Sequence, residues 1–258
     1  MTRYEKTVFT SLLVFLPAGV AAAIWFQLMY ASSSMLVVTG EIAIFVIAFA
    51  INQVVLVVSL RRRFAVAVER QDADALDAVL DETVAMWPRN AKMRAVVDIN
   101  RAVALMFRER WDEAVAQARS ILAGPVAPTQ EAVLLNNLAW ALAHAGALGE
   151  AATLGQRALA GAPTELVRAS ANGTLGAVYA LEGQADRALE YLDAADAINP
   201  DGAAIQATRQ YYRGVAFRSK RWDADAIQAF KAACAAAPAS PFGRRSASVL
   251  ADLQADRR

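Results

Sequence analysis

The chain has very few of the residues that most often carry chemistry. It contains one cysteine, Cys234, and one histidine, His144, in 258 residues. A single cysteine excludes an internal disulfide and any zinc or iron–sulfur site built from several cysteines. The two residues lie in different segments and form no nucleophile–base pair. We therefore expect no enzymatic activity, no catalytic residues, no cofactor and no metal, and we interpret Cys234, which lies among alanines, as a small core residue.

An excess of charge of either sign is also lacking. The formal net charge is +1, which gives no reason to expect a nucleic-acid partner. No glycine-rich phosphate-binding loop is present. Two aspartate pairs, Asp72 with Asp74 and Asp223 with Asp225, have the spacing of some metal ligands. Both pairs precede helical patterns, so we interpret them as helix caps.

Apolar residues are abundant, at 57% of the chain with a mean hydropathy of +0.29. Soluble proteins contain about 45–50% by a comparable count. Much of the excess lies in two uncharged runs, 8–30 and 42–60. Each run is long enough to cross the roughly 30 Å hydrocarbon core as a helix. We predict that residues 1–63 form a transmembrane hairpin with spans at about 8–30 and 35–60.

Positive charges flank this hairpin on one side. Arg3 and Lys6 precede the first span, and Arg61, Arg62 and Arg63 follow the second. Such enrichment is typical of cytoplasmic flanks, so we expect both termini in the cytoplasm and the protein in a bacterial inner membrane. An alternative is that residues 1–33 are a cleaved signal peptide. The second span would then still anchor the remainder.

Small and polar residues within the spans predict helix packing. Gly19 and Ala23 lie four residues apart in the first span, and Glu41, Ala48 and Asn52 share one face of the second. We interpret these faces as contacts within the hairpin or between copies in a homo-oligomer. The alternative for Glu41 is a place on an ion pathway, because ionisable groups in membrane segments are often functional.

Residues 64–258 contain 21 Lys and Arg and 23 Asp and Glu, as a soluble domain would, and they contain an internal repeat. The segments "RAVALMFRERWDEA" (101–114) and "RGVAFRSKRWDADA" (213–226) are similar. Landmark alanines recur at nearly equal intervals, at Ala114, Ala151, Ala188 and Ala226. Intervals of 37 or 38 residues indicate stacked helix hairpins and hence an all-α fold.

The clearest copy, "LGAVYALEGQADRALEYLDAADAINP" (175–200), resembles the tetratricopeptide repeat family. Leu175, Gly176 and Tyr179 match its L-G-x-x-Y pattern, and Pro200 matches its closing proline. The interval between copies is slightly longer than is usual in that family. Arg101 and Arg213 stand where the family has leucine. We expect either that these arginines extend outward or that the repeat register shifts there.

The resemblance implies an α-solenoid over residues 64–258. We predict a degenerate first repeat at 64–89, a C-terminal capping helix at 243–258, and four repeats between them, at about 92–126, 131–164, 168–201 and 205–239. We also expect the second span to continue as a helix through the three arginines into the first repeat.

The resemblance also implies that a protein or peptide partner binds the inner surface, which is lined by the first helix of each repeat. The predicted binding residues are Asn100, Asn137, Trp140, His144, Tyr211 and Arg218. Asparagine can hold a peptide backbone, and tryptophan offers an apolar contact. The alternative is that these side chains are solvated or pack between repeats.

These features predict a membrane-anchored scaffold or adaptor that binds protein partners at the cytoplasmic face of the membrane. The alternative is an accessory subunit of an envelope assembly, secretion or pilus complex. In that case the transmembrane hairpin itself would make the specific contacts.

Overall fold

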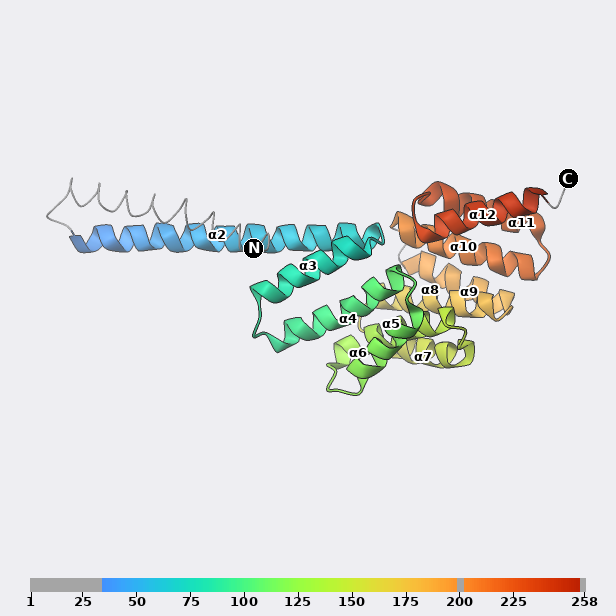
Figure 1. The fold of residues 1–258 in the computed structure, drawn as a ribbon, viewed down its shortest axis with the longest axis horizontal. Coiled ribbons are helices and arrows are strands. Elements are labelled where there is room, and N and C mark those ends of the chain that lie inside the picture. The colour runs from blue at the N-terminus through green and yellow to red at the C-terminus, as the bar shows by residue number, and fades with distance from the viewer. Residues whose placement is uncertain (1–33, 199–201, 256–258) are drawn as a thin grey trace.

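The structure is a computed structural model that describes residues 34–198 and 202–255. The predicted first span, with Gly19 and Ala23, lies outside these residues. The described part consists of helices without strands, which confirms the all-α prediction (Figure 1). The helices are α2 (Ser34–Glu69), α3 (Ala73–Met86), α4 (Ala91–Phe107), α5 (Trp111–Leu122), α6 (Pro128–His144), α7 (Leu148–Ala160), α8 (Glu165–Leu181), α9 (Ala185–Ile198), α10 (Ala203–Ser219), α11 (Asp223–Ala236) and α12 (Pro241–Ala255).

Helix α2 is unbroken over 36 residues, or about 54 Å. It contains Ile44–Glu69, the one segment of the described chain that is long and apolar enough to cross a membrane. Its N-terminal half extends away from all other described helices in Figure 1. From residue 44 on, where its side chains are described, this half carries exposed apolar residues, including Ile44, Ile47, Phe49 and Ile51. The helix therefore runs through the arginine triplet without interruption, as expected from the sequence.

One stripe of α2 is covered by protein. Ala48 and Asn52 are half-buried, and Leu56 and Leu60 are buried. Residues four apart lie on the same face of a helix, so these side chains form one line. Glu41 belongs to α2, but its side chain lies outside the described part. This stripe of α2 is therefore packed against protein, while other faces of the same helix expose apolar side chains.

The arginine triplet has two different environments. Arg61 and Arg62 are exposed, whereas Arg63 is half-buried against α3. The guanidinium of Arg63 donates to both carboxylate oxygens of Glu82, with 3.0 Å between Nη1 and Oε1. Further along, Ala67 packs with Leu76 in one apolar cluster. Within the described residues, Arg61 and Arg62 form no ion pair, and Arg63 alone of the three is bound to a carboxylate.

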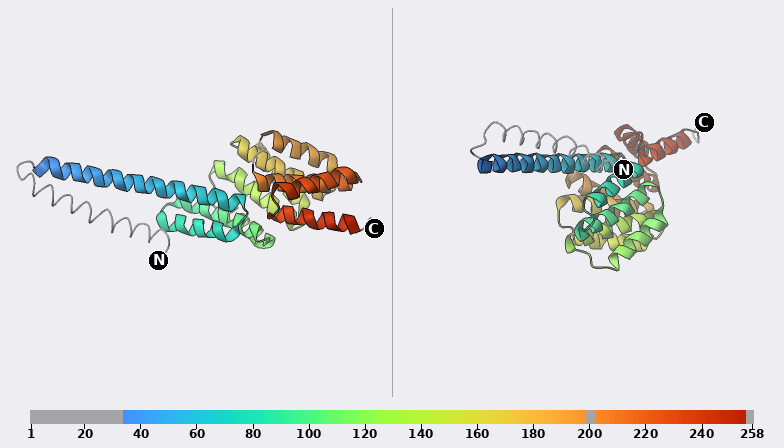
Figure 2. Two further views of the ribbon diagram at one scale, coloured as in Figure 1. Left: turned by 90° about the horizontal axis from the view of Figure 1, so that it is seen from above. Right: turned by 60° about the vertical axis from the view of Figure 1, so that its left-hand side comes forward.

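The remaining helices form a repeating series of hairpins. The first helices α4, α6, α8 and α10 each have 17 residues and begin at nearly equal intervals along the chain. The second helices α5, α7, α9 and α11 begin with the same spacing. Consecutive first helices contact one another, and α12 continues this row against α10. Figure 2 shows the hairpins stacked side by side along the domain.

Glycines on the first helices make room for large side chains on the second helices. A Cβ atom on Gly176 would lie 2.6 Å from Cγ of Leu192, and one on Gly214 would lie 2.6 Å from Cε1 of Phe230. Real Cβ atoms do not approach so closely, so helix pairs α8–α9 and α10–α11 depend on glycine at these positions.

The α6–α7 hairpin has small residues at the equivalent positions of both helices. Ala139 of α6 occupies the position of Gly176, and its counterpart on α7 is Gly155. A Cβ atom on Gly155 would lie 3.9 Å from the Cβ of Ala139 but 2.8 Å from Cδ2 of Leu175 on the next first helix. The size of the side chain at each of the facing positions therefore differs between repeats, while the two helices remain in close contact.

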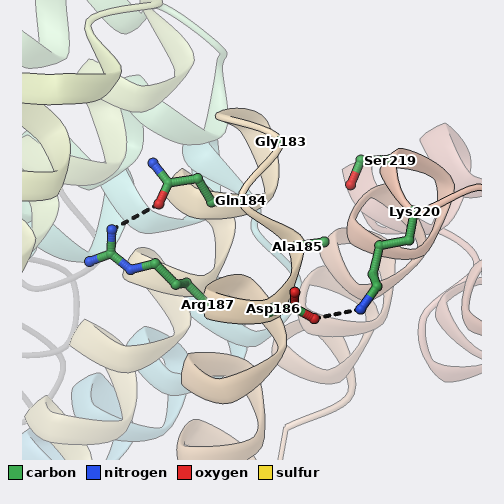
Figure 3. A pocket seen from close by; sticks show the side chains of 7 residues that line it. All are labelled: Gly183, Gln184, Ala185, Asp186, Arg187, Ser219 and Lys220. Atoms are coloured by element: carbon green, nitrogen blue, oxygen red, sulfur yellow. Dashed lines mark hydrogen bonds and ion pairs between the residues drawn. The ribbon is translucent and has the colours of Figure 1, made fainter.

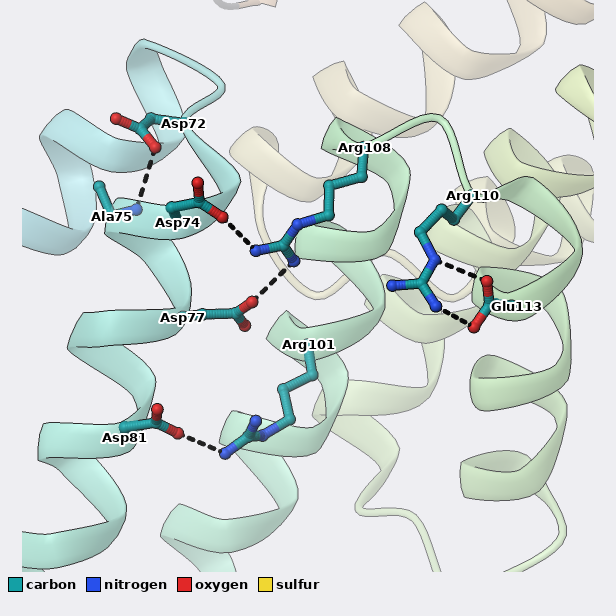
Figure 4. Close-up of polar contacts among 9 residues, drawn as sticks. All are labelled: Asp72, Asp74, Ala75, Asp77, Asp81, Arg101, Arg108, Arg110 and Glu113. Carbon is teal, nitrogen blue, oxygen red and sulfur yellow. Dashed lines mark hydrogen bonds and ion pairs between the residues drawn. The ribbon is translucent and has the colours of Figure 1, made fainter.

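Arg101 and Arg213 keep the repeat register. Both are the eleventh residue of their helices, the place of buried Leu138 and Leu175 in α6 and α8. Arg101 pairs with Asp81 at 2.8 Å (Figure 4), and Arg213 pairs with Asp193 at 2.5 Å. These carboxylates lie on the preceding second helix. The register does not shift, because an ion pair replaces the apolar contact at the two ends of the series.

Acidic residues also hold the helix ends. Asp72 caps α3 by accepting a hydrogen bond from the backbone N–H of Ala75 at 3.0 Å, as predicted (Figure 4). The expected capping role of Asp223 is wrong, because Trp222 occupies the N-cap and α11 has no side-chain cap. Arg108 at the C-terminus of α4 binds Asp74 and Asp77 at 2.6 and 2.7 Å.

Helix α2 also contacts α10, which lies far from it in the sequence. The N-cap of α10 is Gly202, which has no side chain to satisfy the free N–H groups. Glu69, the last residue of α2, accepts the hydrogen bond from the backbone N–H of Ala204 at 3.3 Å. The first and last hairpins therefore meet, and the described series of repeats is closed on itself.

Replacing Gly214 by alanine tests the packing of the repeats, because it places a methyl group against the ring of Phe230. We expect the free energy of unfolding to fall by about 1–3 kcal/mol in denaturant titrations. Gly149→Ala is the matched control, because nothing lies within 4 Å of a Cβ there and alanine favours the helix. Equal stability of Gly214→Ala and the wild type would contradict the packing described here.

Candidate functional site

Six ring-bearing side chains from four helices meet on the inner side of the first helices, and we call them the aromatic cluster. They are Trp111, Trp140, His144, Tyr211, Tyr212 and Phe242. They come from the start of α5, the end of α6, the middle of α10 and the start of α12. Elements that are far apart in the sequence thus converge on one place.

His144 is the centre of the cluster. Its ring stacks on Trp111 with 4.2 Å between centroids and 13° between planes, and the Trp140 ring lies 4.7 Å away. Its Nε2 atom is 3.1 Å from the hydroxyl oxygen of Tyr212. With further ring contacts to Tyr212 and Phe242, the histidine joins α5, α6, α10 and α12 through four ring contacts and one hydrogen bond.

Helix α8 lies between α6 and α10 and carries small residues where the rings meet. Ala177 and Ala180 are buried in the same apolar cluster as Tyr212 and Phe242, with Trp140 packed against it. Larger side chains on α8 would fill this space, because interiors are close-packed. These alanines let the rings from α6 and α10 reach one another.

Helix α12 supplies the last ring. Phe242 is 5% exposed, and its centroid lies 5.3 Å from Tyr211, 5.5 Å from Tyr212 and 5.9 Å from Trp140. One turn later, Arg245 pairs with Glu109 in the turn before α5 at 2.8 Å. A segment of the chain itself therefore occupies part of the predicted binding surface.

The start of α12 fits closely against α11. A Cβ atom on Gly243 would lie 2.0 Å from the carbonyl oxygen of Ala237. The thiol of Cys234 donates to the carbonyl of Gly243 at 3.4 Å. Cys234 is half-buried at this junction, and burial raises the pKa of its thiol. It is thus a contact between two helices rather than a residue of the central core.

Burial keeps His144 neutral. Loss of solvation, together with the positive charge of Arg245, lowers the pKa of His144 from 6.5 to about 4. Burial likewise raises the pKa of Tyr212 above its ordinary value of 10.0. Both groups are uncharged at neutral pH, so the hydrogen bond between them joins a neutral imidazole and a neutral phenol.

The predicted binding residues divide into two groups. Trp140, His144 and Tyr211 come together in the aromatic cluster. Asn100, Asn137 and Arg218 do not join it: Asn100 donates to the carbonyl of Val96 in its own helix at 2.7 Å, Asn137 is half-buried, and Arg218 is exposed.

Sequence reasoning missed Trp111, Tyr212 and Phe242 as members of the cluster. Trp111 was visible as part of the repeated "RWD" motif. Its repeat counterpart Trp222, however, is 47% exposed and lies in no such cluster. The repeat pattern predicts equivalent positions, but it cannot show which of them meets a ring from another hairpin.

Other parts of the described surface have fewer features of a binding site. A shallow depression of about 310 Å³ lies between the α8–α9 turn and the end of α10 (Figure 3). The ion pair between Lys220 and Asp186, 2.5 Å long, crosses its rim. Among the described residues, no three His, Cys, Asp or Glu side chains are grouped as metal ligands. The aromatic cluster and the inner surface around it are therefore the candidate site.

Comparison of the sequence with family models and with curated proteins finds no match.

The buried histidine predicts a pH-dependent stability. His144 takes up a proton near pH 6.5 in the unfolded chain but only near pH 4 in the folded one. The unfolded state therefore binds more protons between these values, and stability falls as the pH drops from 6.5 towards 4, by at most about 3 kcal/mol. We expect His144→Phe to remove this part of the pH dependence in denaturant titrations at pH 7 and pH 5. An unchanged difference between the two pH values in the variant would contradict this assignment.

Proposed function

We propose that this protein is a membrane-anchored scaffold whose tetratricopeptide-type repeats bind a protein or peptide partner at the cytoplasmic face of a bacterial inner membrane. The observation that carries the proposal is helix α2. Its N-terminal half exposes apolar side chains, and its C-terminal half is packed into the first hairpin of the repeats. One helix thus joins the anchor to the binding domain.

The exposed half of α2 supports a lipid environment. Ile44 is 70% exposed, and Ile47 and Ile51 are 58% and 59% exposed, in a run that carries no charged side chain before Arg61. Apolar patches of this kind mark membrane or protein contacts. Exposed Arg61 and Arg62 follow the apolar run and favour a cytoplasmic repeat domain. The first span and the hairpin topology rest on the sequence alone.

The repeat geometry supports the family resemblance. The small residue of the L-G-x-x-Y pattern, Gly176, makes the close contact with Leu192 described above. Tyr179 is buried, and its hydroxyl accepts hydrogen bonds from Gln156 at 2.9 Å and Arg187 at 2.6 Å. The matched residues therefore have packing roles between helices of the same and neighbouring hairpins.

The start of α12 supports a partner-binding role for the inner surface. Phe242 inserts a ring among Trp140, Tyr211 and Tyr212, while Arg245 pairs with Glu109 on the far side. The inner surface can therefore accept an aromatic side chain with a cation one turn away. A partner segment of similar character would bind beside α12 or in its place, with Asn137 available for its backbone.

Partner capture tests the inner surface directly. Crosslinking and affinity capture from native membranes should recover a specific partner with the full-length protein. The double variant Asn137→Ala, Trp140→Ala should lose it, because both groups line the inner surface. Trp222→Ala is the matched control, since this exposed tryptophan lies outside the aromatic cluster and should leave capture unchanged. Loss of the partner in both variants, or in neither, would contradict an inner-surface site.

The alternative function, an accessory subunit of an envelope complex, draws on the same exposed face of α2. Ile44, Ile47 and Ile51 could contact another membrane subunit as readily as lipid. Exchanging residues 1–53 for an unrelated span separates the two functions, because the exchange leaves Arg63 in its pair with Glu82 and Ala67 in its packing against α3. Capture that survives this exchange supports the scaffold, and capture that is lost supports the accessory subunit.

A further inference from the structure

The turn between α3 and α4 lies closer to the apolar half of α2 than any other turn in the repeats. Helix α3 runs back along α2, and the Arg63–Glu82 pair sets their register. Trp87, five residues after Glu82, lies about 7.5 Å further towards the start of α2, level with about residue 58. In Figure 1 this turn lies at the level of the middle of α2, with α3 diverging from α2 and the rest of the repeat domain on the side away from the start of α2.

Several exposed, positively charged side chains lie near the α3–α4 turn and the end of the apolar run of α2. Arg61 and Arg62 on α2 and Arg89, Lys92 and Arg94 at the turn are exposed, and none forms an ion pair within the described chain. Two of the neighbouring carboxylates are engaged elsewhere, because Glu82 binds Arg63 and Asp81 binds Arg101. Asp98, one turn after Arg94 on α4, is half-buried and forms no ion pair with these cations within the described chain. Within the described residues, this level therefore carries five exposed cations that form no ion pair, although the repeat domain as a whole is slightly acidic.

The turn is held in shape by its own hydrogen bonds. Asn90 caps α4 by accepting from the backbone N–H of Met93 at 3.1 Å, and Arg94 donates to the carbonyl of Pro88 at 2.8 Å. Trp87 ends α3 and is half-buried. Tryptophan is enriched at membrane interfaces because its ring is apolar and its N–H is polar. A rigid turn thus combines an interfacial side chain with exposed cations.

We infer that the α3–α4 turn is a second membrane contact, which binds the headgroups of anionic phospholipids beside the place where α2 leaves the bilayer. The inference rests on the proposed function, since it requires α2 to cross the membrane. The exposed cations of the turn are complementary to anionic headgroups. The turn also lies at the level where the apolar run of α2 ends, so lipid is the occupant that the position favours. With two contacts, the repeat domain is held in one orientation against the membrane surface.

The test measures lipid selectivity around the full-length protein. The protein is reconstituted in vesicles of phosphatidylcholine with phosphatidylglycerol, and spin-labelled forms of each lipid report the fraction that the protein immobilises. We expect the wild type to prefer phosphatidylglycerol. The variant Arg89→Glu, Lys92→Glu should lower this preference about fivefold or more, since each basic residue near the surface contributes up to about that factor.

The matched control is Arg218→Glu, Lys231→Glu. These two cations are also exposed and form no ion pair within the described chain, but they lie on α10 and α11, away from the turn. The same change in net charge should here alter the preference by less than about twofold, because a surface charge acts only within about a Debye length. Equal loss in both variants would overturn the inference.

Two further outcomes separate the possible failures. If the wild-type protein is released from membranes by alkaline carbonate, the anchored scaffold itself is wrong. If it stays in the membrane but shows no preference for phosphatidylglycerol, only the lipid contact is wrong. Inorganic phosphate should reduce the preference no more than sodium chloride of equal ionic strength does. A selective loss with phosphate would assign the turn to a free phosphate ion and overturn the lipid assignment.

Discussion

The contact between Arg63 and Glu82 determines how the rest of the molecule is placed. It joins a helix suited to lipid to the first hairpin of the repeats, at the point where α2 changes from an exposed apolar helix to a packed one. Glu82 is largely buried, so loss of Arg63 would leave a carboxylate without its partner, at a cost of several kcal/mol. In a repeat array each hairpin packs mainly on its neighbours, so the orientation of the first hairpin is passed to all the others.

The inner surface is more closed than a row of hairpins alone requires. Glu69 of α2 completes the start of α10, and Phe242 of α12 fills the space over the alanines of α8. A partner would therefore meet a surface that is already partly occupied by rings. This favours recognition through a few deep contacts near Trp140 over an extended groove that is open along its length.

Local patterns in the sequence predicted much of this fold. The apolar run, the landmark alanines and the aspartate at 72 indicated helices, their period and one cap, because each depends on residues close together in the chain. The roles of Arg101 and Arg213 were not predictable, because their carboxylate partners lie on another helix, the preceding second helix of the series. The aromatic cluster was predicted only in part, since Phe242 lies far beyond His144 in the chain and carries no repeat signal.

The most direct test of the central claim is a distance measurement across the Arg61–Arg63 segment of the full-length protein in lipid vesicles. Spin labels at Val58 on α2 and Ala78 on α3, both exposed, with Cys234 replaced by serine, report whether the two helices move as one body. A continuous α2 held by Arg63 and Glu82 predicts one narrow distance distribution, which broadens in Glu82→Ala. A broad distribution in the wild type would place a hinge at the arginines and contradict a rigid connection between membrane helix and repeats.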